Sequence, residues 1–150
     1  MRKNLIFVLP GIVAIQLPAD ITPVCTTELG AFAKLKDEFE KRGVKMIDAQ
    51  DLENIDQKGI AFTIRSVFII DPAKKIRLTM MYPANCGRNT LDVLRVIDSL
   101  QTADKRGVTT PINWQVGDDV IVPPTVSTED TKKRLGEVRK VTSYLRYTKI

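Results

Sequence analysis

The sequence has no histidine among its 150 residues. This absence excludes Ser-His-Asp triads, Cys-His dyads and every other mechanism in which an imidazole acts as the general base. It also excludes the histidine-rich sites that usually hold catalytic zinc. Neither a metal nor a cofactor is expected for this chain.

Aromatic residues are scarce, at 6%, and the basic residues are not clustered. Lys and Arg number 23 against 18 Asp and Glu, yet the longest basic runs are as short as Lys132-Lys133-Arg134. A nucleic-acid surface would gather such charges and place aromatic side chains among them. The excess charge of +5 is therefore interpreted as solvated surface, and no nucleic-acid partner is expected.

Only two cysteines are present, Cys25 and Cys86, and they stand far apart in the sequence. This spacing excludes a CxxC redox pair, a zinc knuckle and a disulfide framework. Two isolated thiols in a domain of this size are typical of a reducing compartment. Cys25 follows a proline-constrained loop at the start of a predicted helix, where unpaired N–H groups and the helix dipole favour a thiolate.

The apolar run Leu5–Leu17, which follows Met1-Arg2-Lys3, has two interpretations. It resembles a signal peptide ending near Ala19, and it also fits a buried strand because several of its residues are β-branched. It is too short to cross a bilayer as a helix, so no membrane association is expected. We favour the strand.

The pattern along the chain alternates between strands and helices. Predicted strands are Leu5–Leu17, broken at Pro10-Gly11, then Val44–Ile47, Thr63–Asp71, Ile76–Tyr82 and Ser143–Thr148; predicted helices run from about Thr26 to Gly43 and from about Asn89. Residues 72–75 form a hairpin turn, and Val108–Ser127 is extended. This order predicts an α/β fold with an open mixed sheet and helices packed against it.

The residues around Cys25 carry a specific motif. Pro18 to Cys25 fits P-x-x-x-T-x-x-C, and Asp20–Gly30 reads DITPVCTTELG, which resembles the active-site block of the one-cysteine peroxiredoxins. The strand around Arg65, the segment Tyr82–Asn89 and several stretches up to Tyr147 resemble the same family in the same order. Cleavage near Ala19 would remove the motif proline, so the resemblance favours the strand and a cytoplasmic location.

The resemblance implies a thioredoxin-like fold with a peroxiredoxin core over residues 1–105 and a C-terminal domain over 106–150. The C-terminal segment is expected to mediate a homodimer. The implied activity is thiol-dependent reduction of hydrogen peroxide and organic hydroperoxides through a cysteine sulfenic acid. An external thiol such as glutathione would then reduce the sulfenic acid.

The resemblance also implies a role for each site residue. Cys25 is the nucleophile, Arg65 its cationic partner, Thr22 a hydroxyl that contacts peroxide and thiolate, and Pro18 a shield from bulk water; Glu28 and Arg88 support the site. Arg65 on an apolar strand is otherwise hard to explain, because an unpaired buried charge is costly. As the partner of a thiolate it has a function.

The chain departs from the family pattern in three ways. Cys86 stands where threonine is usual, either as a neutral change or as a candidate resolving thiol, which would need the two Cα atoms within about 7 Å. Leu17 replaces the usual histidine before the motif proline, and the lipase serine has no counterpart, so no phospholipase activity is expected. The N-terminal hairpin is missing, and several dozen residues are missing near 46–59.

Two functions of different classes therefore remain open: an active thiol peroxidase with a shortened fold, or a catalytically weak subunit that acts through interactions. The first requires that Arg65 still reaches Cys25 in the shortened chain. A separation of the guanidinium from the sulfur beyond roughly 6 Å would count against catalysis.

Overall fold

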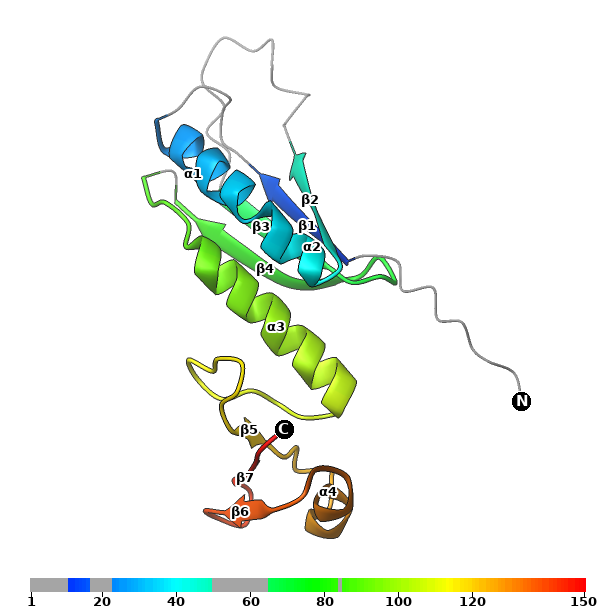
Figure 1. The fold of residues 1–150 in the computed structure, drawn as a ribbon. Helices are drawn as coiled ribbons and strands as arrows, with labels where there is room; N and C mark the ends of the chain where they lie inside the picture. The colour runs from blue at the N-terminus through cyan, green and yellow to red at the C-terminus, as the bar shows by residue number, and fades with distance from the viewer. Residues whose placement is uncertain (1–10, 17–22, 50–64, 84) are drawn as a thin grey trace, which may run out of the picture. The chain divides into compact units, whose positions relative to one another are not determined.

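The computed structural model of the chain describes residues 11–16, 23–49, 65–83 and 85–150 (Figure 1). The chain divides into two compact units, Met1–Thr90 and Leu91–Ile150. The boundary between them lies at residue 90, and the family domain boundary expected at residue 105 stays a prediction. Each unit is described by itself.

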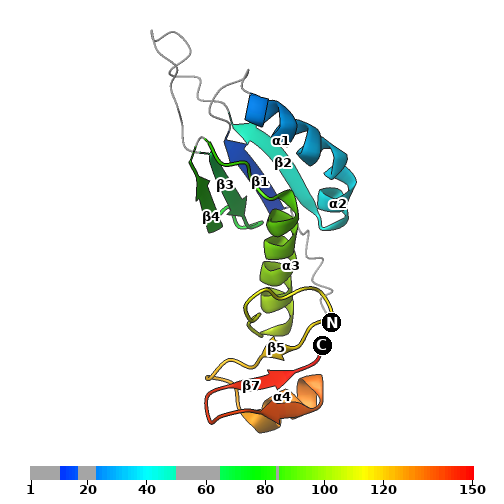
Figure 2. The same cartoon turned by 90° about the vertical axis from the view of Figure 1, so that its left-hand side faces the viewer.

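A four-stranded mixed sheet forms the centre of the first unit, in the order β2-β1-β3-β4. Its strands are β1 (Gly11–Gln16), β2 (Val44–Ala49), β3 (Arg65–Ile70) and β4 (Ile76–Tyr82). β1 pairs in parallel with β2 and antiparallel with β3, and β3 and β4 form an antiparallel hairpin. Two helices, α1 (Pro23–Lys34) and α2 (Lys36–Lys41), lie along one face of this sheet (Figure 1, Figure 2). The predicted α/β fold with a mixed sheet and flanking helices is confirmed.

The first helix begins earlier than the sequence predicts, at Pro23 instead of near Thr26. Proline is well tolerated at the first helical position, because the N–H that it lacks would have no partner within the helix. The predicted single helix is also interrupted at Leu35, whose backbone departs from helical angles (φ −98, ψ 8). Gly43 follows α2 with φ +64, a left-handed conformation that glycine adopts without strain. Cys25 consequently lies in the first turn of α1.

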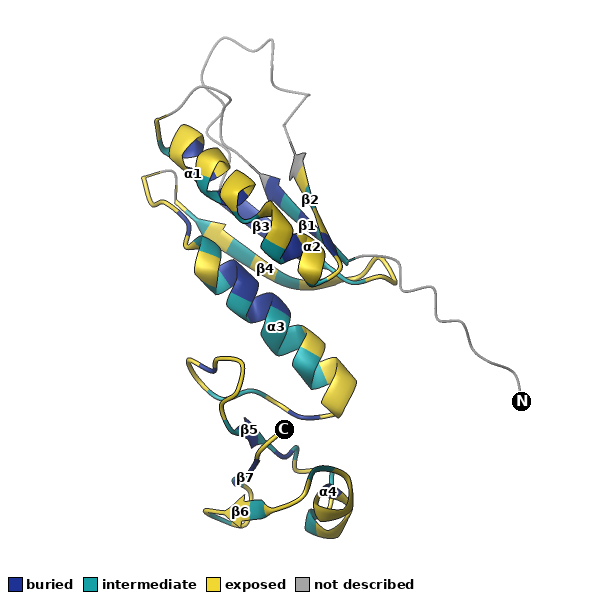
Figure 3. Ribbon diagram, in the orientation of Figure 1, coloured by how far each residue is buried: buried dark blue, intermediate teal, exposed yellow. Residues whose placement is uncertain are grey.

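Buried apolar side chains of the central strands and the helices form the core of this unit (Figure 3). Val13 of β1 and Val67 of β3 are fully buried, and Phe32 and Phe39 are buried on the helices with their ring centroids 6.2 Å apart. β2 and β4 are the edge strands of the sheet among the described residues, and Ile47 on β2 is 47% exposed. Residues 50–59 of the predicted shortened region lie outside the described residues.

The β3–β4 hairpin follows the sequence pattern closely. The Asp71 side chain accepts a hydrogen bond from the backbone N–H of Lys75 at 2.9 Å and so closes the predicted turn. Lys74 adopts φ 62 within that turn. Exposed and half-buried residues alternate along β4 from Arg77 onward, as expected for a strand with one packed face. The hairpin places Arg65 at the beginning of a buried strand.

The second unit contains α3 (Thr90–Arg106), α4 (Thr128–Leu135) and a small antiparallel sheet in the order β5-β7-β6. The strands are β5 (Val120–Ile121), β6 (Val138–Lys140) and β7 (Arg146–Thr148). The predicted terminal strand is present and is shorter than expected. Ser127 caps α4, its hydroxyl accepting from the backbone N–H of Asp130 at 3.0 Å.

Trp114 anchors the core of the second unit. It is 1% exposed, packs with Val108 and Val120, and donates its indole N–H to the Asp118 carbonyl at 3.2 Å. We expect Trp114→Ala to lower the free energy of unfolding by about 3–5 kcal/mol, because the substitution leaves a cavity in a small core. Urea unfolding followed by far-ultraviolet circular dichroism measures this loss.

Ile112→Ala is the matched control, because Ile112 is 89% exposed on the same segment. Its expected change in unfolding free energy is within about 0.5 kcal/mol. Equal effects of the two substitutions would contradict the assignment of Trp114 as the anchor.

Candidate active site

Cys25 lies in the first turn of α1 and is completely buried. The N–H groups at a helix N-terminus and the helix dipole stabilise negative charge there. The first turn of α1 contains no acidic side chain that would oppose this effect. The fold therefore places the sulfur at the end of the helix where negative charge is stabilised.

Arg65 brings a permanent positive charge to the sulfur. It is the first residue of β3, is 2% exposed, and its Nη1 donates to Cys25 Sγ at 3.3 Å. This separation meets the condition set by the sequence for an active site, although the two residues are 40 positions apart. A guanidinium at this distance stabilises negative charge on the sulfur.

Glu28 links the two arginines of the site. Arg65 Nη1 donates to Glu28 Oε2 at 3.0 Å, and Arg88 Nη2 donates to the same oxygen at 2.7 Å. The backbone N–H of Arg88 donates to Glu28 Oε1 at 2.8 Å. Glu28 lies one turn after Cys25 and so holds the Arg65 guanidinium on the same side of the helix as the thiol.

The charge state of Glu28 follows from its surroundings. Burial alone would raise the pKa of this carboxyl group, but the hydrogen bonds from Arg88 and the charges of Arg88 and Arg65 outweigh burial and lower the pKa. The carboxylate is therefore ionised at neutral pH. Two guanidinium groups and one carboxylate leave these three side chains with one net positive charge, which a thiolate at Cys25 would neutralise.

Arg88 is fixed from several sides in addition to its bonds to Glu28. Its Nη1 donates to the Ser66 carbonyl on β3 at 3.1 Å, and its guanidinium carbon lies 5.9 Å from the centroid of the Phe32 ring. Sequence reasoning missed Ser66 and Phe32. No sequence signal identifies a backbone carbonyl as an acceptor, and Phe32 has the pattern of an ordinary core residue.

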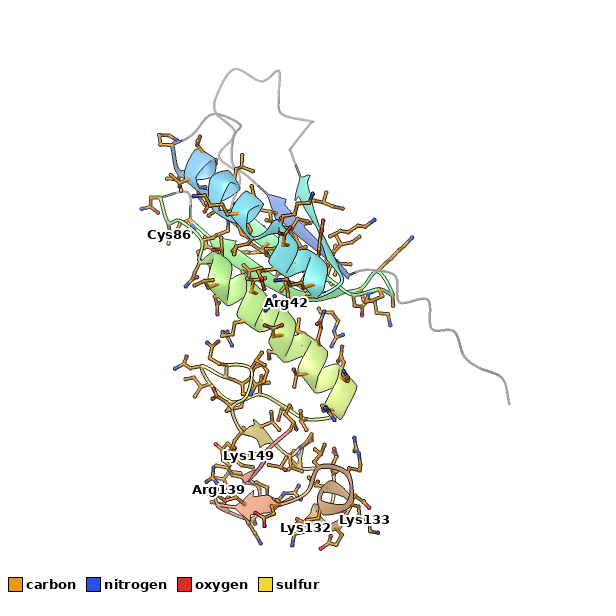
Figure 4. All side chains as sticks on the ribbon, in the orientation of Figure 1. Arg42, Cys86, Lys132, Lys133, Arg139 and Lys149 are labelled. Carbon is orange, nitrogen blue, oxygen red and sulfur yellow. The ribbon has the colours of Figure 1, made fainter. Side chains whose placement is uncertain are left out.

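The structure brings together four of the predicted site residues: Cys25, Arg65, Glu28 and Arg88. Pro18 and Thr22 lie outside the described residues, and their roles stay predictions. Cys86 is exposed on the loop that follows β4 (Figure 4), and no disulfide joins it to Cys25.

No group of three or more His, Cys, Asp or Glu side chains suited to a metal ion occurs within residues 11–16, 23–49, 65–83 and 85–150. In the same part of the chain, no helix has the length and hydropathy needed to cross a membrane.

A buried cysteine at a helix N-terminus, held against an arginine on a mixed sheet, defines a thiol-based redox site. Residues 99–137 match the family described as the C-terminal domain of 1-Cys peroxiredoxin. The chain is 45% identical to the mitochondrial peroxiredoxin PRX1 of Saccharomyces cerevisiae in an alignment of 177 positions that covers 88% of this chain and 67% of that protein. It is 35% identical to human peroxiredoxin-6 in an alignment of 183 positions that covers 87% of this chain and 81% of that protein.

Solved structures agree with these relatives. A structure of the yeast mitochondrial 1-Cys peroxiredoxin matches with a TM-score of 0.86 and 42% identity, covering 95% of this chain and 88% of that one. A cysteine-to-serine mutant of peroxiredoxin 6 from Arenicola marina matches with a TM-score of 0.85 and 36% identity, covering 95% and 86%. The chain belongs to the 1-Cys peroxiredoxin family. It is a thiol-dependent peroxidase with a thioredoxin-like fold.

The comparison with the yeast protein also bears on the missing length. That alignment extends over 177 positions, more than the 150 residues of the whole chain. Several dozen positions of the relative therefore have no counterpart here, in agreement with the predicted shortening.

Proposed function

We propose that Cys25 is the peroxidatic nucleophile and that Arg65 and Glu28 assemble its site. The observation that carries this proposal is the 3.3 Å contact between Arg65 Nη1 and Cys25 Sγ, made by a guanidinium that Glu28 also holds. The intact contact favours the enzyme over a catalytically weak interaction subunit, because the shortened chain still places the charge beside the sulfur.

The reaction is a displacement on a peroxide oxygen. The Cys25 thiolate attacks one oxygen, the O–O bond breaks, and the other oxygen leaves with a proton as water or an alcohol. Sulfur is oxidised to a sulfenic acid, and the peroxide is reduced. The Arg65 guanidinium stabilises the thiolate and the charge that develops on the departing oxygen. Thr22 and Pro18 are proposed to complete the site, one contacting the peroxide and the other excluding water.

The partners proposed are hydrogen peroxide or an organic hydroperoxide as substrate and an external thiol as reductant. A structure of the yeast 1-Cys peroxiredoxin describes thiol resolution through glutathione and thioredoxin systems, which supports a reductant of this class. A homodimer through the C-terminal segment is proposed from the family resemblance. The scattered basic residues support neither a nucleic-acid nor a membrane partner.

A cytoplasmic location is proposed, because removal of residues up to Ala19 would destroy the Pro18 motif. The yeast relative is named as a mitochondrial protein, so the proposal places this chain in a different compartment from that relative. Fractionation of cells that express the untagged chain tests the proposal. Recovery in the mitochondrial fraction would contradict it.

The decisive experiment measures sulfenic acid formation at Cys25. The Cys86→Ser variant is used because it leaves Cys25 as the only thiol, so that every label reports on one site. We expect dimedone to label Cys25 after one equivalent of hydrogen peroxide, with a rate constant at least about a hundredfold above that of free cysteine. Mass spectrometry of the quenched reaction measures labelling over time.

Free cysteine at the same pH is the reference reaction. Labelling of the folded variant at the same rate as free cysteine would overturn the proposal. Cys25 and Glu28 lie on α1, so the site requires this helix to be folded. Far-ultraviolet circular dichroism of the variant checks that its helix content is retained.

A further inference from the structure

The second unit contains a hollow of about 580 Å³, lined by residues of α4, β6 and β7 and by residues beside them. Ligand sites in proteins usually have volumes of about 300–1,000 Å³ and an apolar lining with a few polar groups. Leu135, Val138 and Tyr147 are half-buried and supply the apolar part of this lining. Leu135 also packs against the core cluster around Trp114, so the lining is held in place by the folded core.

Three basic side chains from different elements line the same hollow. They are Lys132 of α4, Arg139 of β6 and Lys149, which follows β7, and Figure 4 shows them around α4 and the small sheet. All three residues are exposed. The fold therefore groups basic residues that the sequence keeps apart.

Arg139 is held in position by two contacts. Its guanidinium carbon lies 4.8 Å from the centroid of the Tyr147 ring, and its Nη2 donates to Asp119 Oδ2 at 3.2 Å. The Asp119 carboxylate compensates the charge of this guanidinium. Arg139 therefore gives the hollow a fixed wall, and its charge is already balanced.

The two lysines differ from Arg139 in this respect. Within the part of the chain that the structure describes, neither Lys132 nor Lys149 forms an ion pair through its ammonium group. Glu137 is the remaining carboxylate of the lining. The hollow therefore has an excess of one positive charge, and two ammonium groups can pair with carboxylates of a ligand.

The composition of the hollow fits a peptide better than a nucleic acid. Single-stranded nucleic acids stack their bases on aromatic rings, but Arg139 lies over the ring of Tyr147. The carboxylates of Asp119 and Glu137 would also repel a phosphate backbone. An acidic peptide has widely spaced carboxylates, and it can place an aliphatic side chain on the apolar lining between them.

We propose that this hollow binds an acidic peptide segment of a partner protein, in which carboxylates flank an aliphatic side chain. The carboxylates pair with Lys132 and Lys149, and the aliphatic side chain packs against Leu135 and Val138. The lining contains no residue of the candidate active site, so binding does not depend on the oxidation of Cys25.

The test compares Lys132→Glu with Lys133→Glu in the whole reduced chain. The two lysines are adjacent, exposed residues of α4, but only Lys132 lines the hollow. The probe is a rhodamine-labelled pentapeptide with one leucine between two pairs of glutamates, and fluorescence anisotropy measures its dissociation constant. At about 0.15 M salt we expect Lys132→Glu to weaken binding about tenfold and Lys133→Glu at most about twofold, because salt screens charges beyond about 8 Å.

Two further comparisons keep the result independent of α4 and of the label. Lys149 lies outside every helix and strand, and Lys149→Glu should weaken binding as much as Lys132→Glu does. The same labelled peptide with glutamine in place of glutamate should bind about tenfold more weakly than the acidic peptide, because it cannot form the ion pairs.

Three results would overturn the proposal. The first is an equal loss in Lys132→Glu and Lys133→Glu, which would show that the peptide responds to surface charge in general. The second is no binding of the acidic peptide by the wild type, or binding that neither Lys132→Glu nor Lys149→Glu weakens. The third is a single-stranded oligonucleotide that binds more tightly than the peptide and loses affinity in Lys132→Glu, which would assign the hollow to nucleic acid.

Discussion

Replacing Arg65 with alanine is expected to slow the oxidation of Cys25 by hydrogen peroxide by about 100–1000-fold, the usual cost of removing a group that stabilises charge in the transition state. The substitution removes the guanidinium 3.3 Å from the sulfur. Both the thiolate and the departing oxygen lose their cationic partner. The rate constant is measured by dimedone labelling in the Cys86→Ser background, so that Cys25 is the only thiol that can be labelled.

Arg77→Ala is the matched control for this prediction. Arg77 lies on β4, the partner strand of β3, and its Nη1 is 3.7 Å from Asp71 Oδ2 instead of near the thiol. Its removal takes the same charge from the same hairpin, and the expected rate stays within about twofold of the parent. An Arg65→Ala variant that reacts as fast as Arg77→Ala would show that Cys25 does not depend on Arg65.

The Arg65→Lys variant tests whether the positive charge alone, without the planar guanidinium, is enough to speed the oxidation of Cys25. Lysine keeps a positive charge but lacks the planar guanidinium. We expect a rate between those of the parent and Arg65→Ala, because the ammonium group still stabilises negative charge but no longer holds the same position against Glu28.

The sequence predicts local elements better than their assembly. The β3–β4 hairpin was predictable because the pattern of two strands around a short turn is local, and the bond from Lys75 to Asp71 spans only a few residues. The start of α1 at Pro23 and its interruption at Leu35 were missed, since neither changes the spacing of apolar residues. The strand order β2-β1-β3-β4 depends on pairing between distant segments, which periodicity does not encode.

For the candidate site, too, the sequence indicated individual residues better than the contacts between them. Through resemblance to a family, the motif around Cys25 and the strand at Arg65 indicated two residues that the structure brings into contact. The resemblance indicated that Glu28 orients an arginine, but that it bonds both arginines was not predictable, because Arg88 is 60 residues away and the contact exists only in the folded chain. The sequence also could not determine whether the contact between Arg65 and Cys25 forms in a shortened chain. The contact forms because β1 pairs directly with both β2 and β3, so residues missing between β2 and β3 do not separate Cys25 from Arg65.

Glu28→Gln is expected to lower the free energy of unfolding by about 3–5 kcal/mol, the cost of removing one partner from a buried ion pair. Glu28 is 4% exposed and accepts hydrogen bonds from Arg65 and Arg88. Glutamine keeps the size of the side chain but loses the charge, which leaves two buried guanidinium groups that repel each other. Oxidation of Cys25 should slow as well, because Arg65 is no longer held beside the sulfur.

Glu38→Gln provides the control for this substitution. Glu38 also bonds two cations, Lys41 and Arg42, but it lies on the surface of α2, where water screens the charges. Its replacement should change stability little and leave the rate at Cys25 unaltered. Comparable losses in the two variants would show that burial of the Glu28 cluster is not the source of its effect.

The pH dependence of the free energy of unfolding distinguishes the effect of the Glu28 charge from the effect of its packing. The arginines hold the pKa of Glu28 below its ordinary value of 4.5, so the unfolded chain binds this proton more readily than the folded protein does. The stability that the carboxylate contributes is therefore fully present above pH 4.5 and is lost as the pH falls through the lower pKa of the folded state. Urea unfolding of the wild type and Glu28→Gln across this range should show a constant difference at neutral pH that narrows in acid. A difference that does not change with pH would mean that the carboxylate acts by its shape, and that its charge is not what holds Arg65 against Cys25.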